Sequence, residues 1–199
     1  GLDPEEEYLA VQKHLSRRPD AVLLTGVQHV TETRRLLLAA GIPVVEVWEV
    51  TNTPIDVCVG FDHVGAGVAA AEFAFSKGYR DAAVISAHDR RAGLRMRAFA
   101  GRFAALGGEV FASCVSEQVS GLIAGRSMMA DLAVVHSLRP NSFVFCSSDT
   151  IAHGALIEAK ARGLRVPEDI AVMGFGDQDF AGYIDPPLAT IRVDRESLG

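Results

Sequence analysis

The chain has 199 residues, of which 49% are hydrophobic, so it has enough apolar side chains for a buried core and is not a disordered segment. Its net charge of -6 argues against a chain that itself holds nucleic acid, because neutralising phosphates needs a clustered Lys/Arg face. No stretch approaches the roughly 18 apolar residues of a membrane span, so we expect no membrane contact.

Short apolar segments alternate with helical segments along the chain. Asp3, Pro4 and the three glutamates that follow predict a first helix that runs to about Arg17, with a capping side chain and acids at its positive end. In chain order we then expect strand 21–25, helix 31–40, strands 44–48 and 57–61, helix 64–77, strand 82–86, helix 91–106, strand 110–115, helix 122–138, strand 142–146, helix 150–162 and strand 170–174. This alternation predicts an α/β fold with parallel sheets flanked by helices.

The alternation breaks in two places. A polar T-N-T-P segment with no helix joins the second and third strands, and no long helix separates Gly174 from the extended segment 189–193. In a two-lobed binding protein these are the points where the chain passes between lobes. We therefore expect an N-terminal lobe of residues 1–61 plus 190–199 and a C-terminal lobe of residues 62–189.

Cysteines and histidines give no metal or disulfide pattern. Cys58, Cys114 and Cys146 lie in apolar segments, which predicts unpaired thiols and favours a reducing, cytoplasmic location. The six histidines form no H-x-x-x-H or Cys/His cluster, and there is no G-x-S-x-G motif. The G-A-G-V-A-A segment at 65–70 has the wrong spacing from its strand for a dinucleotide. We expect no metal, no cofactor and no catalytic residue.

Polar residues gather where the predicted strands end. Ligands of parallel α/β sheets bind outside the carboxyl ends of the strands, so side chains there point at a ligand more often than elsewhere. Carboxylates accept pairs of hydroxyl hydrogen bonds, an arginine offers a fork of donors, and an aromatic ring covers an apolar sugar face. The strand-end set comprises Glu46, Trp48, Glu49, Asp62, His63, His88, Asp89, Arg95, Ser148, Asp149, Asp177 and Asp179.

Several motifs resemble one protein family. V-G-F-D-H-V-G-A-G at 59–67, R-M-R-A-F at 95–99, S-S-D-T-I-A-H-G-A at 147–155 and V-P-E-D at 166–169 occur in the order of the lactose/galactose repressor family, in its effector-binding core. The resemblance implies a two-lobed type I periplasmic-binding-protein-like fold that binds a sugar effector between its lobes. It also implies a homodimer and an N-terminal headpiece that holds operator DNA. The family's opening strands and headpiece would precede Gly1, so we expect the first lobe to be incomplete here.

The resemblance also implies particular roles for residues. Arg95 takes the place of the family's effector-contacting arginine, and Ser148 and Asp149 take the place of its Asn-Asp pair. Gly176 stands where the family commonly has an acid, so Asp177 comes one residue later. With Phe61 as a pocket-wall aromatic, the predicted ligand-binding residues are Arg95, Ser148, Asp149, Asp177, Phe61, Trp48, Glu46 and His63.

The segments E-V-W-E-V-T-N-T-P-I-D-V-C-V-G-F and G-F-G-D are similar to the branch of the family that regulates gluconate use. The sequence therefore predicts a transcription regulator's sensing and dimerising core, with a gluconate-like effector whose carboxylate meets Arg95. Two alternatives stay open. One is a solute-binding component of a sugar transporter, which shares the fold. The other is an α/β enzyme that uses Asp62, Arg95 and Asp177 as acid/base groups.

Overall fold

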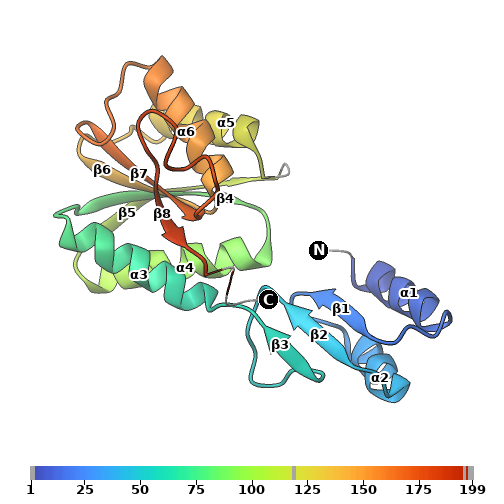
Figure 1. Cartoon of the computed structure of the whole chain (residues 1–199). Helices are drawn as coiled ribbons and strands as arrows, with labels where there is room; N and C mark the ends of the chain where they lie inside the picture. The colour runs from blue at the N-terminus through green and yellow to red at the C-terminus, as the bar shows by residue number, and fades with distance from the viewer. Residues whose placement is uncertain (1–2, 118–119, 195, 197–199) are drawn as a thin grey trace. The chain divides into compact units, whose positions relative to one another are not determined.

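The computed structural model describes residues 3–117, 120–194 and 196. Contacts divide the chain into two compact units, residues 1–62 with 195–199 and residues 63–194 (Figure 1). Each unit contains one parallel sheet and the helices that cover it. Within the described residues, no helix is long and apolar enough to cross a membrane.

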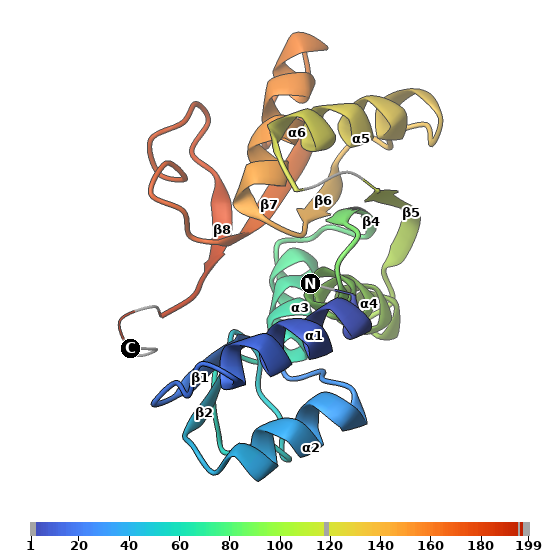
Figure 2. The same ribbon diagram turned by 90° about the vertical axis from the view of Figure 1, so that its right-hand side faces the viewer.

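The first unit is a three-stranded parallel sheet with the strand order β1-β2-β3. Two helices, α1 and α2, lie side by side (Figure 2) and pack on the sheet through a small core that centres on Val11, Leu37 and Val44. Its elements are α1 (Pro4–Leu15), β1 (Val22–Thr25), α2 (Thr31–Ala40), β2 (Val44–Val47) and β3 (Val57–Val59).

The second unit is a five-stranded parallel sheet with the strand order β5-β4-β6-β7-β8. Figure 1 shows α3 and α4 on one face of this sheet and α5 and α6 on the other. Its elements are α3 (His63–Ser76), β4 (Asp81–Ala87), α4 (Arg90–Ala105), β5 (Glu109–Ser116), α5 (Leu122–Val134), β6 (Ser142–Cys146), α6 (Asp149–Ala161), β7 (Ile170–Gly176) and β8 (Ala189–Arg192).

Strand alternation divides the core of the second unit into two layers. In β6, Phe143 and Phe145 face α3 and α4, whereas Val144 and Cys146 face α5 and α6. Because successive side chains point to opposite faces, a strand covered on both sides is apolar throughout, and all five residues of β6 are buried. On the α3–α4 side, Phe99 packs against both β6 phenylalanines, with ring centroids 4.9–6.1 Å apart.

The predicted α/β class and the alternation of strands and helices are confirmed. The expected lobe boundary near Thr190 needs correction, because β8 pairs with β7 along Met173–Gly176 and therefore belongs to the second unit, which extends to Asp194. The sequence showed no helix between β7 and β8, but it did not show that the two strands pair. Strand β7 also runs two residues beyond the predicted end, and α5 ends four residues earlier than predicted.

The small residues at the start of α3 bring it close to α4. A Cβ atom at Gly67 would lie 2.2 Å from the carbonyl oxygen of Arg95 and 2.9 Å from the Cβ of Ala98. Only glycine permits this approach. The G-A-G-V-A-A segment is thus a helix-packing feature, and it places the first turn of α3 against the residues of α4 that form the site described next.

Candidate functional site

The candidate site lies at the carboxyl edge of the second sheet. Strands β4, β6 and β7 are adjacent and parallel, so their carboxyl ends meet at one edge. Helices α4 and α6 begin within a few residues of the ends of β4 and β6. The polar residues predicted on these loops are thereby brought to one side of the sheet, which is the usual location of ligands in parallel α/β folds.

Arg95 is a buried arginine at this edge, with 6% of its surface exposed. One guanidinium nitrogen, Nη1, lies 2.7 Å from Nδ1 of His63, and Nη2 donates to the carbonyl oxygen of Ser147 at 2.8 Å. The guanidinium carbon stands 4.0 Å from the ring centroid of Phe175. Because arginine only donates, His63 accepts through Nδ1 and carries its proton on Nε2 as a neutral imidazole.

Burial dominates the electrostatics of Arg95. It lowers the pKa of the guanidinium to about 10, an effect that Asp89 opposes and Arg91 reinforces. The Nε–H group is buried and makes no hydrogen bond within the described residues. The protein thus holds a cation in place with only part of its donors used, an arrangement in which an anionic or hydroxyl-rich ligand would be bound strongly.

Asp149 organises the next part of the edge. It is fully buried at the first position of α6, where one carboxylate oxygen accepts from the backbone N of Gln178 at 2.7 Å and the other accepts from the hydroxyl of Thr190 at 2.6 Å. A Cβ atom at Gly174 would lie 2.3 Å from this carboxylate, so the strand needs glycine there. Asp149 therefore links the ends of β6, β7 and β8.

Asp177 follows directly after β7 with a left-handed backbone, φ 52°. Its carboxylate accepts from Nε of Arg192 at 2.6 Å, and its backbone N donates to the Thr190 hydroxyl at 3.2 Å. Gly176 before it also has a positive φ, 127°. The glycine in the position of the family's acid thus lets the chain turn, and the displaced Asp177 forms an ion pair with β8.

Ser148 is the N-cap of α6. Its hydroxyl accepts from the backbone N of Ile151 at 3.3 Å and lies 3.1 Å from the hydroxyl of Ser120. This hydroxyl thus satisfies one of the backbone N–H groups at the start of α6. Ser147 performs another task, since its hydroxyl accepts from the backbone N of Ala87 at 3.0 Å and joins the ends of β4 and β6.

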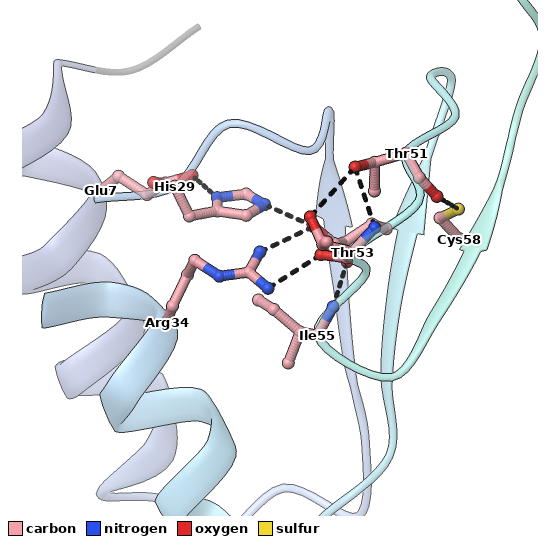
Figure 3. Close-up of polar contacts among 8 residues, drawn as sticks. Glu7, His29, Arg34, Thr51, Thr53, Ile55 and Cys58 are labelled. Carbon is pink, nitrogen blue, oxygen red and sulfur yellow. Dashed lines mark hydrogen bonds and ion pairs between the residues drawn. The ribbon is translucent and has the colours of Figure 1, made fainter. Parts of the chain in front are cut away.

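The remaining predicted ligand residues, Glu46, Trp48 and Phe61, lie in the first unit. Glu46 is fully buried, and its Oε2 accepts from the backbone N of Ile55 at 2.7 Å. Its Oε1 lies 3.4 Å from Nε2 of His29 and 3.9 Å from Nη1 of Arg34 (Figure 3). These contacts stabilise the loop between β2 and β3, a structural task that residue type alone does not reveal.

Trp48 follows β2 with 44% of its surface exposed and a left-handed backbone, φ 75°. A non-glycine residue in this conformation is uncommon, and residues with a strained backbone cluster at functional sites. Phe61 is half-buried and follows the short strand β3. Both therefore lie just after a strand end, as predicted, and their contact with a ligand stays a prediction.

Sequence reasoning missed three residues of the second-unit edge: the Ser147 carbonyl, Phe175 and Thr190. Alternation along β7 places Phe175 on the same face as Met173, toward α4, so its position beside Arg95 could have been found from strand period. The place of Thr190 depends on its register opposite Gly174, which no local pattern indicates. Every residue has a backbone carbonyl, so the residue type gives no indication that the carbonyl oxygen of Ser147 accepts from Arg95.

Two further predictions concern cysteines and metals. All three cysteines are free, as expected, and burial raises the pKa of Cys146 and of Cys114, with smaller contributions from Asp149 and Asp131 respectively. The residues that the structure describes contain no group of three or more His, Cys, Asp or Glu that could hold a metal ion.

A family model described as a periplasmic binding protein-like domain matches residues 71–199, which include α4, α6 and the ends of β4, β6 and β7. The chain belongs to this family. Its resemblance to the effector-binding core of the lactose/galactose repressor family, near the gluconate branch, is confirmed by relatives and solved structures.

The "HTH-type transcriptional regulator GntR" of Pseudomonas aeruginosa is 34% identical over 197 residues, which are 98% of this chain and 57% of the relative. The structure of a LacI-family transcriptional regulator from Silicibacter pomeroyi superposes with a TM-score of 0.90 at 31% identity, over 98% of this chain and 59% of that one. A LacI-family regulator from Lactobacillus casei with bound glucose has a TM-score of 0.79 at 27% identity, over 98% and 74%. The chain thus spans little more than half the length of the regulator from P. aeruginosa.

Proposed function

We propose that this chain is the effector-sensing and dimerising core of a sugar- or sugar-acid-responsive transcription regulator, with a gluconate-like effector. The observation that carries the proposal is Arg95, a buried cation at the carboxyl edge of the sheet whose Nε–H makes no hydrogen bond in the described part of the chain. Ligand oxygens would complete its donor fork. The LacI-family regulator from Lactobacillus casei with bound glucose supports a sugar as the ligand, and the P. aeruginosa relative supports a transcription regulator.

Within this proposal, Arg95 and His63 bind the effector, and the Ser148, Asp149 and Asp177 loops complete the site. Trp48 and Phe61 of the first unit are proposed to contact the effector as predicted, whereas the fully buried Glu46 would act through the β2–β3 loop that it holds. The effector acts by preferring one conformation of the regulator and so changes the fraction that can hold operator DNA through a headpiece. A homodimer suits this task because a two-fold protein matches two DNA half-sites.

A thermal-shift panel of sugars, sugar acids and sugar phosphates tests the sensing function. A ligand at 100 times its dissociation constant stabilises the folded protein by about 2.7 kcal/mol, which is readily measured. We expect gluconate or a close relative to give the largest shift. If none of these ligands stabilises the protein, it is not a sugar sensor.

The transporter alternative predicts a different assembly. A solute-binding component usually stays monomeric, whereas the proposed regulator is a cytoplasmic homodimer. Size-exclusion chromatography of the intact protein at micromolar concentration distinguishes the regulator from the transporter component, because a monomer that binds sugar would favour transport.

The enzyme alternative requires turnover of gluconate or a sugar phosphate that is lost on Asp177→Ala, and we expect no turnover.

A further inference from the structure

The first unit contains a histidine whose ring lies between two carboxylates. His29, in the loop between β1 and α2, places Nδ1 2.9 Å from Oε1 of Glu7 on α1 (Figure 3) and Nε2 3.4 Å from Oε1 of Glu46 on β2. The side chain of His29 is only 1% exposed, and that of Glu46 is fully buried. Water solvates neither group, so the protonation of the ring depends on these two neighbours.

Both ring nitrogens face an acceptor. A carboxylate only accepts hydrogen bonds, so the Nδ1 that bonds to Glu7 carries a proton. In a neutral ring, Nε2 would then be a bare acceptor opposite the buried carboxylate oxygen of Glu46, with no hydrogen between them. Neither Nε2 of His29 nor Oε1 of Glu46 has another hydrogen-bond partner in the described part of the chain. A ring protonated on both nitrogens removes this conflict and attracts both acids.

The charges around the ring balance only when it is an imidazolium. Arg34 on α2 places Nη1 3.9 Å from Oε1 of Glu46, so Glu7 and Glu46 face Arg34 and His29 as two acids and two bases. No hydrogen bond or ion pair within the described residues joins these four to the two other acids of the adjoining loop, Glu49 and Asp56. A neutral ring would leave a net negative charge in this largely buried cluster, which is unfavourable.

The same cluster holds the loop between β2 and β3, residues 48–56. Oε2 of Glu46 accepts from the backbone N of Ile55 at 2.7 Å, and Nη2 of Arg34 donates to the carbonyl oxygen of Thr53 at 2.9 Å. Trp48, at the first position of this loop, is the only tryptophan of the chain. A change of charge on the ring therefore acts on the segment that begins with Trp48.

We propose that His29 is a proton-dependent positioning residue. Protonated on both nitrogens, it joins Glu7 to Glu46 and fixes the β2–β3 loop with Trp48, and loss of the Nε2 proton loosens that loop. The loop is thus held while the acids are ionised and the ring is doubly protonated, and it is released as the pH rises. The inference concerns the first unit alone and requires no ligand. Its consequence for the effector, a weaker affinity once the proton is lost, rests on the proposed function, in which Trp48 contacts the ligand.

The first measurement is the 15N NMR spectrum of the histidine rings in the intact chain, with His29 assigned from its absence in His29→Gln. We expect both ring nitrogens of His29 to carry hydrogen at about pH 7.5, where an exposed histidine is mostly neutral. His14, exposed on α1, provides that reference. A bare Nε2 of His29 at this pH overturns the inference.

The second measurement is hydrogen exchange of the Ile55 amide, expressed as protection relative to an unstructured peptide so that the base catalysis of exchange cancels. We expect the wild type to protect this amide while His29 keeps both protons. As the pH rises and the ring becomes neutral, protection should fall at least about tenfold, the effect of losing one hydrogen bond to a charged group. The fluorescence of Trp48 should change over the same pH range.

Three variants separate the proton from the packing, once thermal unfolding has established that each folds. His29→Gln cannot donate to two carboxylates on opposite sides, so Ile55 should be weakly protected at every pH. Glu46→Gln offers an amide that donates to a neutral ring while its oxygen still accepts from Ile55, so protection should stay and its pH dependence should vanish. His14→Gln, the matched control at an exposed histidine of the same unit, should keep the wild-type protection within about twofold.

Protection of Ile55 that does not change with pH in the wild type overturns the inference, as does a pH dependence that persists in Glu46→Gln. If a variant fails to fold, the ring spectrum and the pH titration of the wild type still decide. Failure of the proposed function is a separate outcome, because a chain that binds no sugar in the thermal-shift panel can still show the doubly protonated ring and the held loop. A ligand whose affinity is the same on both sides of the transition overturns only the link to the effector.

Discussion

Replacing Arg95 with methionine separates the cost of a buried charge from its use in ligand binding. The pKa of Arg95 falls from 12.5 to about 10, and at about 1.4 kcal/mol per pKa unit the buried charge costs roughly 3 kcal/mol in the unliganded protein. Removing it restores that amount. The change also removes the donors of two hydrogen bonds, to His63 and to Ser147 O, worth about 1.5–3 kcal/mol each. Methionine keeps an apolar contact with the ring of Phe175.

The two contributions nearly cancel, so we expect Arg95→Met to lower the free energy of unfolding by no more than about 3 kcal/mol, or roughly 10 °C in Tm. Effector binding should suffer far more. If the dissociation constant rises a hundredfold, a ligand concentration that stabilises the wild type by about 2.7 kcal/mol stabilises the variant by only about 0.4 kcal/mol.

Thermal unfolding with and without gluconate, or with the panel's strongest ligand, measures both quantities. Arg102→Met, a change of the same side chain at an exposed position near the other end of α4, where it pairs with Glu72, is the control for general effects of charge. A variant that unfolds at a similar temperature and keeps the full ligand-induced rise would show that Arg95 lies outside the site. A loss of stability well beyond 3 kcal/mol would show that the burial cost is overvalued.

Two further predictions concern packing and pH. Gly67→Ala should lower the free energy of unfolding by at least about 2 kcal/mol, because its Cβ would lie 2.2 Å from the Arg95 carbonyl oxygen. Gly101→Ala, whose Cβ would meet nothing within 4 Å, should instead raise the free energy of unfolding by about 0.5–1 kcal/mol. Denaturant titrations measure both, and equal effects of the two substitutions would contradict the close packing of α3 and α4. The side-chain hydrogen bond from Arg165, helped by its backbone N–H, lowers the pKa of Asp169 to about 2, so the stability that this pair contributes is present above pH 3.8 and lost as the pH falls toward 2. Arg165→Gln should move the NMR titration midpoint of Asp169 back toward 3.8, and an unmoved midpoint would exclude the pair.

Local patterns in the sequence were enough to predict the α/β class, the succession of strands and helices and the strand-end position of the polar residues. They work because a strand buried on both faces must be apolar throughout and a helix end needs a cap or a glycine. The motif around Arg95 singled out an arginine that the structure shows to be buried, and its contact with a ligand stays a prediction. In these cases the physical cause lies within a few neighbouring residues.

The tertiary structure decided how those residues are used. Glu46 and Asp149 are both acids for which the sequence predicted a ligand contact. In the folded chain, Glu46 accepts a hydrogen bond from the backbone of the β2–β3 loop, and Asp149 joins β6 to β7 and β8. Their partners, such as Ile55 N and the Thr190 hydroxyl, are distant in the chain or belong to the backbone. The pairing of β8 with β7 and the contact of the Phe175 ring with Arg95 likewise depend on long-range strand register, which only the folded chain determines.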